Sequence, residues 1–230
     1  MQSPTHLLST LKTLFFLPIP GGLKGRAELL YWLFQFKKQG RLDNTHYEPF
    51  FTTYFGFSRS DFAGKRLLDI GCGPRGSLEW ATNAAERVGL DPLAEVYRLF
   101  GVDQHQMVYK AAGSEQIPFS NDYFDVVSSF NSLDHVADLS ATIAEIKRVV
   151  VPGGYFMLIT DVGHKPTITE PRSFGFEIVE AFLPEFSPIQ VRKFEKNVKR
   201  AIYESLRRAI PYDETNPIPR YGVLAALFRK

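Results

Sequence analysis

Three glycines and one aspartate form the pattern in this sequence with the clearest chemical meaning. Gly71, Gly73 and Gly76 spell G-x-G-x-x-G between a short apolar run and a predicted helix. Asp91 lies 20 residues after the first of these glycines. Such glycines allow a tight turn and a close approach of the backbone to a ligand, and the later carboxylate can accept both hydroxyls of a ribose. The pattern predicts a site for a nucleotide-type cofactor, and several cofactor classes share it.

Two neighbours of the glycines favour one kind of cofactor. Pro74 lies inside the loop and removes a backbone N–H that a pyrophosphate would use. Asp69 precedes the first glycine at the end of a strand, where a carboxylate would repel a pyrophosphate but suits an amine or a sulfonium. We therefore expect a cationic cofactor without phosphates, and a nicotinamide-dependent oxidoreductase is the alternative.

Histidines and carboxylates after two later strands are the candidates for proton transfer. His135 stands beside Asp134, which can orient the imidazole while it takes a proton from a hydroxyl or an amine. The alternative is a histidine that packs under its loop or caps the next helix. Asp161 and His164 form either a second acid–base pair or part of a solvated loop. No group of ligands shows the spacing of a metal site, so we expect no metal.

An alternation of strands and helices must position these residues. Apolar runs predict strands, amphipathic runs predict helices, and breakers such as Pro152 separate them. This alternation implies right-handed crossovers and a mostly parallel sheet, and we expect the last two strands to form an antiparallel edge. The predicted strands cover residues 66–70, 88–91, 107–111, 123–130, 155–160, 189–194 and 221–228, and the predicted helices cover 77–85, 92–100, 139–150, 174–183 and 197–210.

The first 60 residues depart from this alternation and predict a helical cap. We expect helices over residues 7–19 and 26–39. The second is apolar nearly all round, which predicts a helix that is buried or covered. A role at a membrane surface is the weaker alternative, because a basic polar face is missing.

Six ordered motifs between residues 65 and 161 resemble those of the class I S-adenosylmethionine-dependent methyltransferases. Each motif alone is weak, but six in this order and spacing are specific. The resemblance implies a Rossmann-like, doubly wound, mostly parallel seven-stranded sheet with an antiparallel last strand. It divides the chain into an N-terminal helical cap over 1–60 and a cofactor-binding methyltransferase domain over 61–230. The motifs are LDIGCGP (68–74), GLDP (89–92), GSEQIPF (113–119), FDVV (124–127), LDHV (133–136) and VVPGG (150–154).

The resemblance also implies roles for individual residues. The glycine loop would hold the methionine portion of the cofactor, and Asp91 would bind the ribose hydroxyls. Ser114 and Glu115 would flank the adenine, where Gly113 replaces an aspartate of many relatives. The residues after the fourth strand would line the face on which the methyl group is transferred. The cofactor-binding residues implied in this way are Asp69, Gly71, Cys72, Gly73, Asp91, Pro92, Ser114, Glu115, Asn131 and Ser132.

Composition excludes several other classes of protein. The 230 residues are 44% hydrophobic, carry a net charge of +2 and include one cysteine, Cys72. A disordered chain and a disulfide scaffold are therefore excluded. No unbroken apolar stretch reaches about 18 residues, so we expect no membrane-spanning helix. A lone cysteine fits a reducing, cytoplasmic location, and we expect it to be a small residue of the glycine loop rather than a nucleophile.

The expected function is methyl transfer from S-adenosylmethionine to a small-molecule acceptor, at oxygen or nitrogen, with S-adenosylhomocysteine as product. No module for binding nucleic acid or peptides is present, so nucleic acid is not the expected partner. The segment over 192–208 has seven Lys or Arg against two acidic residues, and a protein or RNA acceptor is therefore one alternative. A cofactor-binding relative without catalysis is another.

Overall fold

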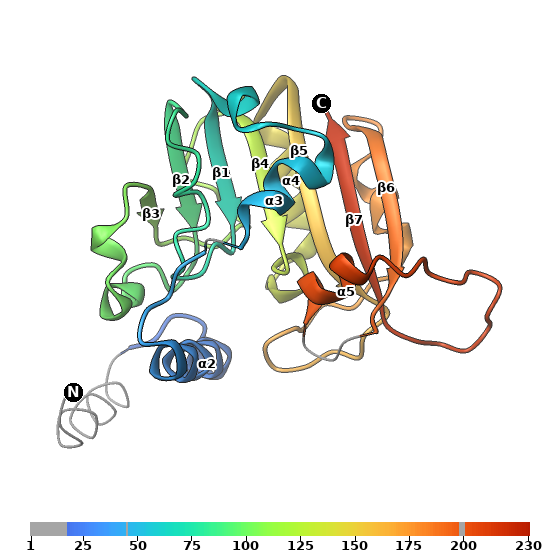
Figure 1. Ribbon diagram of the computed structural model, residues 1–230, viewed down its shortest axis with the longest axis horizontal. Coiled ribbons are helices and arrows are strands. Elements are labelled where there is room, and N and C mark those ends of the chain that lie inside the picture. Colours follow the sequence, from blue (N-terminus) through green and yellow to red (C-terminus); the bar gives the residue numbers. More distant parts are fainter. Residues whose placement is uncertain (1–17, 45, 198–200) are drawn as a thin grey trace.

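A seven-stranded sheet forms the centre of the molecule (Figure 1). The computed structural model describes residues 18–44, 46–197 and 201–230. The strand order is β3-β2-β1-β4-β5-β7-β6, with β1 to β5 parallel and β7 antiparallel to both neighbours, which confirms the predicted sheet. The strands are β1 (Arg66–Ile70), β2 (Glu86–Leu90), β3 (Val108–Lys110), β4 (Phe124–Phe130), β5 (Val150–Val162), β6 (Ser187–Glu195) and β7 (Gly222–Arg229).

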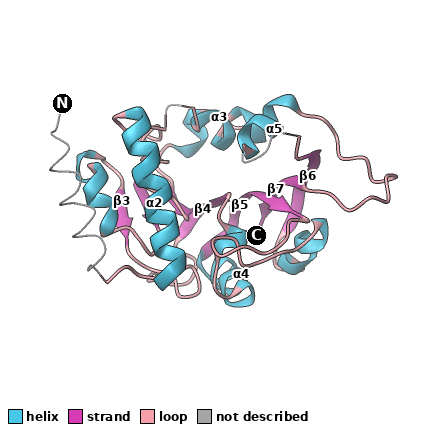
Figure 2. Ribbon diagram, turned by 90° about the horizontal axis from the view of Figure 1, so that it is seen from below, coloured by secondary structure: helices cyan, strands magenta, loops and turns pink. Residues whose placement is uncertain are grey.

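Helices cover both faces of the sheet, which explains why its central strands are continuous apolar runs. In β1, Leu67 packs on the side of α3 and α5, whereas Leu68 packs on the opposite side with α4. Figure 2 shows the sheet between these two layers. The described α-helices are α2 (Gly22–Gln39), α3 (Glu48–Phe51), α4 (Leu139–Val149) and α5 (Ile202–Arg208).

The order of the strands reverses between β1 and β4, and this reversal places the candidate site. From β1 the chain adds β2 and β3 on one side, and then returns to add β4 and β5 on the other. Ligands of such sheets bind in the crevice at the carboxyl ends of the strands next to the reversal. α2 lies across this edge of the sheet (Figure 1, Figure 2). Its inner side packs on the segment after β2, where the Phe36 and Phe100 ring centroids lie 5.6 Å apart.

The predicted helix over residues 77–85 is wrong, because this segment is a series of turns. Its internal hydrogen bonds reach back only three residues, as from the Ala81 N–H to the Leu78 carbonyl. The Glu79 carboxylate accepts the N–H of Met107 at 2.8 Å, which fastens the segment to the loop before β3. Tertiary hydrogen bonds therefore satisfy groups that a helix would have paired.

The predicted helix over 92–100 is reduced to a 3-10 helix at its end. The Asp91 carboxylate accepts the N–H of Leu93 at 2.9 Å and turns the chain before an α-helix can begin. Gly101, at a φ of 83°, ends the segment. The predicted helix over 174–183 is likewise a 3-10 helix. Of the predicted helix over 197–210, α5 forms Ile202–Arg208, and residues 198–200 lie outside the described part of the chain. The described 3-10 helices are η1 (Thr53–Phe55), η2 (Arg59–Phe62), η3 (Val96–Phe100), η4 (Val102–Gln104), η5 (Leu133–His135) and η6 (Phe176–Phe182).

The N-terminal helices differ from expectation. The predicted helix over 7–19 lies almost wholly outside the described residues. α2 forms as predicted, but the expectation that it is buried or covered is wrong for its outer side. Leu23, Leu30 and Phe34 are 78%, 58% and 64% exposed there. Within the described ranges, no helix is long and apolar enough to cross a membrane.

Candidate active site

The loop after β1 forms a cradle in which the backbone lies against its neighbours. Gly71 has a φ of 70°, and a Cβ there would lie 2.3 Å from the Cβ of Ser132. Gly73 has a φ of 57°, and a Cβ there would lie 2.7 Å from the indole ring of Trp32 on α2. Both positions require glycine, because other residues rarely adopt this conformation and no space remains for a side chain.

Two buried carboxylates stand at this cradle, one at the end of β1 and one directly after β2. Asp69 Oδ1 accepts a hydrogen bond of 2.6 Å from Ser128 Oγ. Asp91 Oδ2 accepts the N–H of Gly73 at 3.2 Å, and its other oxygen accepts the N–H of Leu93. Burial raises the pKa of each carboxyl to about 6, although these hydrogen bonds favour the ionised form.

The cradle therefore carries negative charge that is not balanced by a basic side chain. In the described part of the chain, neither Asp69 nor Asp91 forms an ion pair. An unpaired buried carboxylate is costly, so a bound amine or sulfonium would stabilise the ionised forms. A pyrophosphate would instead meet like charge at both carboxylates. The residues present fit a cationic, ribose-bearing cofactor without phosphates.

Three further residues predicted at the site hold the shape of the cradle. Ser132 Oγ donates a 2.7 Å hydrogen bond to the Ile70 carbonyl and ties the end of β4 to the end of β1. Asn131 has a left-handed φ of 55°, and its N–H donates to the Ile159 carbonyl. Burial raises the pKa of the Cys72 thiol, which therefore stays protonated and is a poor nucleophile.

The residues predicted at the adenine turn their polar groups toward α4. The hydroxyls of Ser114 and Thr142 lie 2.9 Å apart. Glu115 Oε1 accepts two backbone N–H groups just before α4, at 2.7 and 3.1 Å. Pro92 is exposed at the start of the loop after β2. The structure thus gathers the residues expected at the methionine and ribose, whereas Ser114 and Glu115 hold the start of α4.

The three predicted catalytic residues lie together at the carboxyl end of β4. Asp134 is fully buried in η5. His164 Nε2 lies 3.4 Å from one of its carboxylate oxygens, and His135 Nε2 lies 3.9 Å from the other. Contact with Asp134 raises the pKa of His164 to about 9, against the opposing effect of burial. At neutral pH His164 is therefore an imidazolium, whose Nδ1 donates to the Lys165 carbonyl at 3.1 Å.

The predicted pairing of Asp161 with His164 is wrong. Lys196 Nζ donates to both carboxylate oxygens of Asp161, at 2.6 and 2.5 Å. Lys196 is itself nearly buried, with a side chain that is 7% exposed, so this ion pair is largely shielded from water. His164 pairs with Asp134 instead, because the loop after β5 folds back onto η5.

Glu28 of α2 is a site residue that the sequence analysis missed. Its Oε1 lies 3.2 Å from His135 Nδ1 and 2.8 Å from Lys24 Nζ. Burial lowers the pKa of His135, but the hydrogen bond with Glu28 and the charge of Asp134 outweigh it and raise this pKa above its usual value. The one signal in the sequence is that Glu28 and Trp32 are four residues apart, a spacing that puts both on the same side of a helix.

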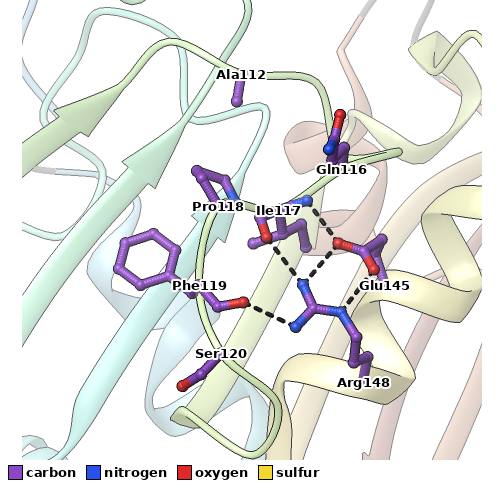
Figure 3. A pocket seen from close by; sticks show the side chains of 8 residues that line it. All are labelled: Ala112, Gln116, Ile117, Pro118, Phe119, Ser120, Glu145 and Arg148. Carbon is purple, nitrogen blue, oxygen red and sulfur yellow. Dashed lines mark hydrogen bonds and ion pairs between the residues drawn. The ribbon is translucent and has the colours of Figure 1, made fainter.

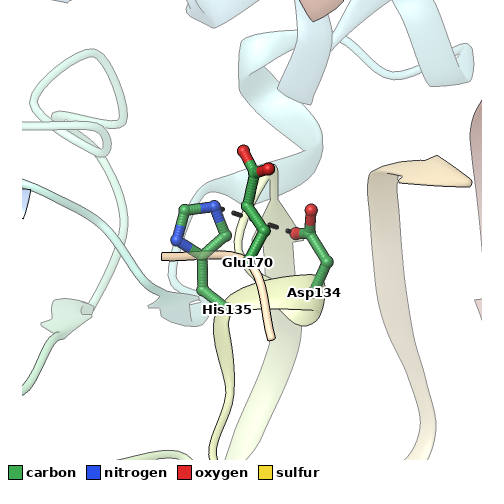
Figure 4. A group of neighbouring side chains, drawn as sticks. All are labelled: Asp134, His135 and Glu170. Atoms are coloured by element: carbon green, nitrogen blue, oxygen red, sulfur yellow. Dashed lines mark ion pairs between the residues drawn. The ribbon is translucent and has the colours of Figure 1, made fainter. Parts of the chain in front are cut away.

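Glu170 is a second missed neighbour (Figure 4). It comes from the loop after β5, and one carboxylate or imidazole atom from each of Glu170, Asp134 and His135 lies within 4.8 Å of the others. The N–H of Arg172 donates to the Asp134 carbonyl and holds the loop in this place. The spacing of these residues in the sequence does not indicate the group, because this loop packs on η5 only in the folded chain.

Two surface hollows lie outside this group of residues. One, of ≈ 660 Å³, is lined by the loop over 112–120 and by Glu145 and Arg148 of α4 (Figure 3). Arg148 donates to Glu145 and to two carbonyls of the loop, so its charge holds the loop in place. The other, of ≈ 670 Å³, lies between the C-terminal end of α2 and η3. Neither includes Asp69 or His135, since α2 lies over the cradle.

Comparison with known proteins agrees with this geometry. Residues 68–158 match the family model described as a methyltransferase domain. The chain is 30% identical over 167 residues to a ubiquinone biosynthesis O-methyltransferase of Mesorhizobium japonicum, and 33% identical over 149 residues to that of Hahella chejuensis. These alignments cover 70% and 61% of this chain, and they span only 64% and 60% of the relatives' own length.

A solved structure shares the fold. The S-adenosylmethionine-dependent methyltransferase from Mesorhizobium loti is 18% identical with a TM-score of 0.53, aligned over 74% of this chain and 92% of that one. The matched residues contain the parallel strands from β1 into β5, together with the glycine cradle after β1 and the buried acid after β2. In sequence and in fold, residues 68–158 of this chain therefore match a methyltransferase domain.

Proposed function

We propose that this protein transfers the methyl group of S-adenosylmethionine to a small-molecule acceptor, at oxygen or nitrogen, and releases S-adenosylhomocysteine. The observation that carries the proposal is the pair of buried carboxylates, Asp69 and Asp91, at the glycine cradle. Burial makes the ionised forms of these carboxyls costly in free energy, and a bound cation offsets that cost. A sulfonium cofactor with a ribose supplies both the cation and two hydroxyl donors.

The cofactor brings an already activated methyl group, so the task of the chain is to hold it and to align the acceptor. In this assignment Asp69 binds the amino group of the methionine portion, and Asp91 binds the ribose hydroxyls. Gly71 and Gly73 let the backbone approach both. Trp32 closes the cradle from α2 and keeps water away from it.

His135 is assigned to take the proton of the acceptor. Glu28 and Asp134 lie at its two ring nitrogens, at 3.2 and 3.9 Å, which restrains the ring and stabilises the imidazolium that proton transfer creates. His164 is already charged at neutral pH and balances Asp134. We therefore assign His164 a positioning role rather than that of a base.

The acceptor is proposed to be a small aromatic molecule methylated at oxygen. The two relatives are named for O-methylation in ubiquinone biosynthesis, and this favours oxygen over nitrogen. Aromatic side chains on the side of α3 and α5 suit such an acceptor, since the Tyr203 ring lies 4.8 Å from those of Tyr47 and Phe50. Residues 1–60 would act as the cap, with α2 as its part over the cradle.

A nucleic-acid or protein acceptor finds less support. The basic segment over 192–208 offers little free charge, because its described lysines and its C-terminal arginines form ion pairs within the chain. Their partners are Asp161, Glu204 and Glu214.

Incubation of the purified chain with methyl-labelled S-adenosylmethionine and a fractionated cell extract tests the proposal. We expect label in the small-molecule fraction, and none when the chain carries Asp69→Asn, because that variant loses the charge that holds the cofactor. Label in the protein or RNA fraction would contradict a small-molecule acceptor. Binding of the donor without transfer to any fraction would indicate a cofactor-binding protein without catalysis.

Trp32→Ala is expected to speed the dissociation of S-adenosylmethionine about tenfold, because it removes the aromatic ring that closes the cradle over Gly73. Stopped-flow displacement measures this rate. Phe34→Ala is the matched control, since Phe34 lies on the same helix but is 64% exposed on the outer side. An unchanged rate in Trp32→Ala would show that α2 does not close the cradle.

A further inference from the structure

The side of α2 that faces away from the sheet is apolar and exposed. At 3.6 residues per turn, its exposed apolar residues fall on one side of the helix, opposite the side that carries Glu28 and Trp32. Contiguous exposed apolar side chains on a folded domain mark contact with another molecule or with lipid. Four such side chains are 54% to 78% exposed, and we call them the outer face: Leu23, Leu30, Tyr31 and Phe34.

Lysines accompany the outer face, and acidic residues are absent from it. Lys37 and Lys38 are exposed in the last turn of α2. The one acidic residue of the helix, Glu28, turns inward to His135 and Lys24. Two exposed lysines therefore lie beside the apolar stripe, in the last turn of α2. Such a helix suits a membrane interface, with apolar side chains at the acyl boundary and lysines at anionic head groups.

The outer face also lies where an acceptor must enter. α2 crosses the carboxyl edge of the sheet, next to the cradle (Figure 2). The loop after β5 belongs to the same edge and carries Ile168, which is 68% exposed. Both elements reach the proposed base, because Glu28 from α2 and Glu170 from this loop flank His135. A surface that contacts both α2 and the loop after β5 would therefore face the proposed active site.

We propose that α2 docks the protein on an anionic lipid surface, with the outer face and the Ile168 loop in the interface. An apolar acceptor then passes from the bilayer into the site beneath α2. The delivery of the acceptor rests on the proposed function, whereas the docking does not. A second copy of the chain is the alternative occupant, and a two-fold contact through α2 would leave Lys37 and Lys38 of each copy without an acidic partner on the outer face of the other.

Co-sedimentation with vesicles tests the proposal, using the full chain. We expect binding to vesicles of phosphatidylcholine with about one-third phosphatidylglycerol, weak binding to phosphatidylcholine alone, and loss of binding in high salt. The double variant Leu30→Ser/Phe34→Ser is expected to weaken binding to the anionic vesicles at least about tenfold. Lys37→Glu/Lys38→Glu is expected to weaken it by about the same factor.

The controls are matched in chemistry but lie elsewhere on the molecule. Ile189→Ser removes an apolar side chain, 51% exposed, from the edge strand β6. Arg229→Glu reverses a charge at the end of β7, at the opposite edge of the sheet. We expect both to bind vesicles as the wild type does. Every variant should bind S-adenosylmethionine normally. If the wild-type chain binds the cofactor but no vesicle, the docking proposal is overturned and the proposed function is not.

Three outcomes would overturn the docking proposal. The first is equal binding to neutral and anionic vesicles. The second is binding that survives Leu30→Ser/Phe34→Ser. The third is a concentration-dependent dimer, seen by sedimentation velocity, that this double variant abolishes, because the outer face would then belong to a second copy of the chain.

Discussion

Asp91→Ala is expected to weaken the binding of S-adenosylmethionine at least about a hundredfold, as measured by isothermal titration calorimetry. In the proposed site the carboxylate accepts both ribose hydroxyls, and each hydrogen bond to a charged group contributes about 1.5–3 kcal/mol. The same carboxylate accepts the N–H groups of Gly73 and Leu93, so its loss also loosens the cradle.

Two variants separate these effects. Asp91→Asn keeps an oxygen for one of the two backbone N–H groups and removes the charge, so we expect a folded protein with weakened binding. Asp103→Ala removes an aspartate whose side chain is 69% exposed in η4, and it should bind as the wild type does. Unchanged affinity in Asp91→Asn and Asp91→Ala would contradict the assignment of the ribose to Asp91.

His135→Asn is expected to lower turnover by a factor of about a hundred to ten thousand while it changes cofactor affinity little, because it removes a general base. The side chain lies at Glu28 and Asp134 rather than in the glycine cradle. Steady-state kinetics and calorimetry on the same preparation measure the two effects. Wild-type turnover in His135→Asn would show that this residue has only a structural role.

No metal is expected to take part in the reaction, so a chelating agent should leave the turnover of the wild-type protein unchanged.

The pH profile shows whether His135 acts as a base. Only the neutral imidazole accepts a proton, so turnover should rise with pH through the pKa of His135, which lies above its usual 6.5. Glu28→Gln removes the carboxylate that holds this pKa up, and the acidic limb of the profile should move to lower pH. The limb should vanish in His135→Asn. A limb that stays in place in Glu28→Gln would contradict the role of Glu28.

The sheet and the cradle could be predicted because their signals are local in the sequence. β1 spans Arg66–Ile70, as predicted, since Leu67, Leu68 and Ile70 form a short apolar run whose side chains are buried on both faces of the sheet. Asp69, Gly71 and Gly73 lie within five residues at the end of that strand. Their chemistry follows from one turn that the local sequence already indicates.

The features that could not be predicted depend on residues distant in the sequence. The segment after β1 is not helical because Glu79 bonds the backbone at Met107. Glu28 and Glu170 reach His135 only after α2 and the loop after β5 have packed at the same edge. The outer face of α2 was expected to be covered, and only the packed structure distinguishes its exposed side from the side on the cradle.

A pH series of calorimetric titrations decides whether the cradle is built for a cationic methyl donor. Burial holds the pKa values of Asp69 and Asp91 at about 6, and a bound cation would lower both. S-adenosylmethionine should therefore bind with full affinity at neutral pH and lose affinity as the pH falls below about 6, because protons then compete with the cation. NAD⁺ should not bind. Binding of NAD⁺ without S-adenosylmethionine, or an affinity for the methyl donor that does not change across this range, would contradict the site described for this chain.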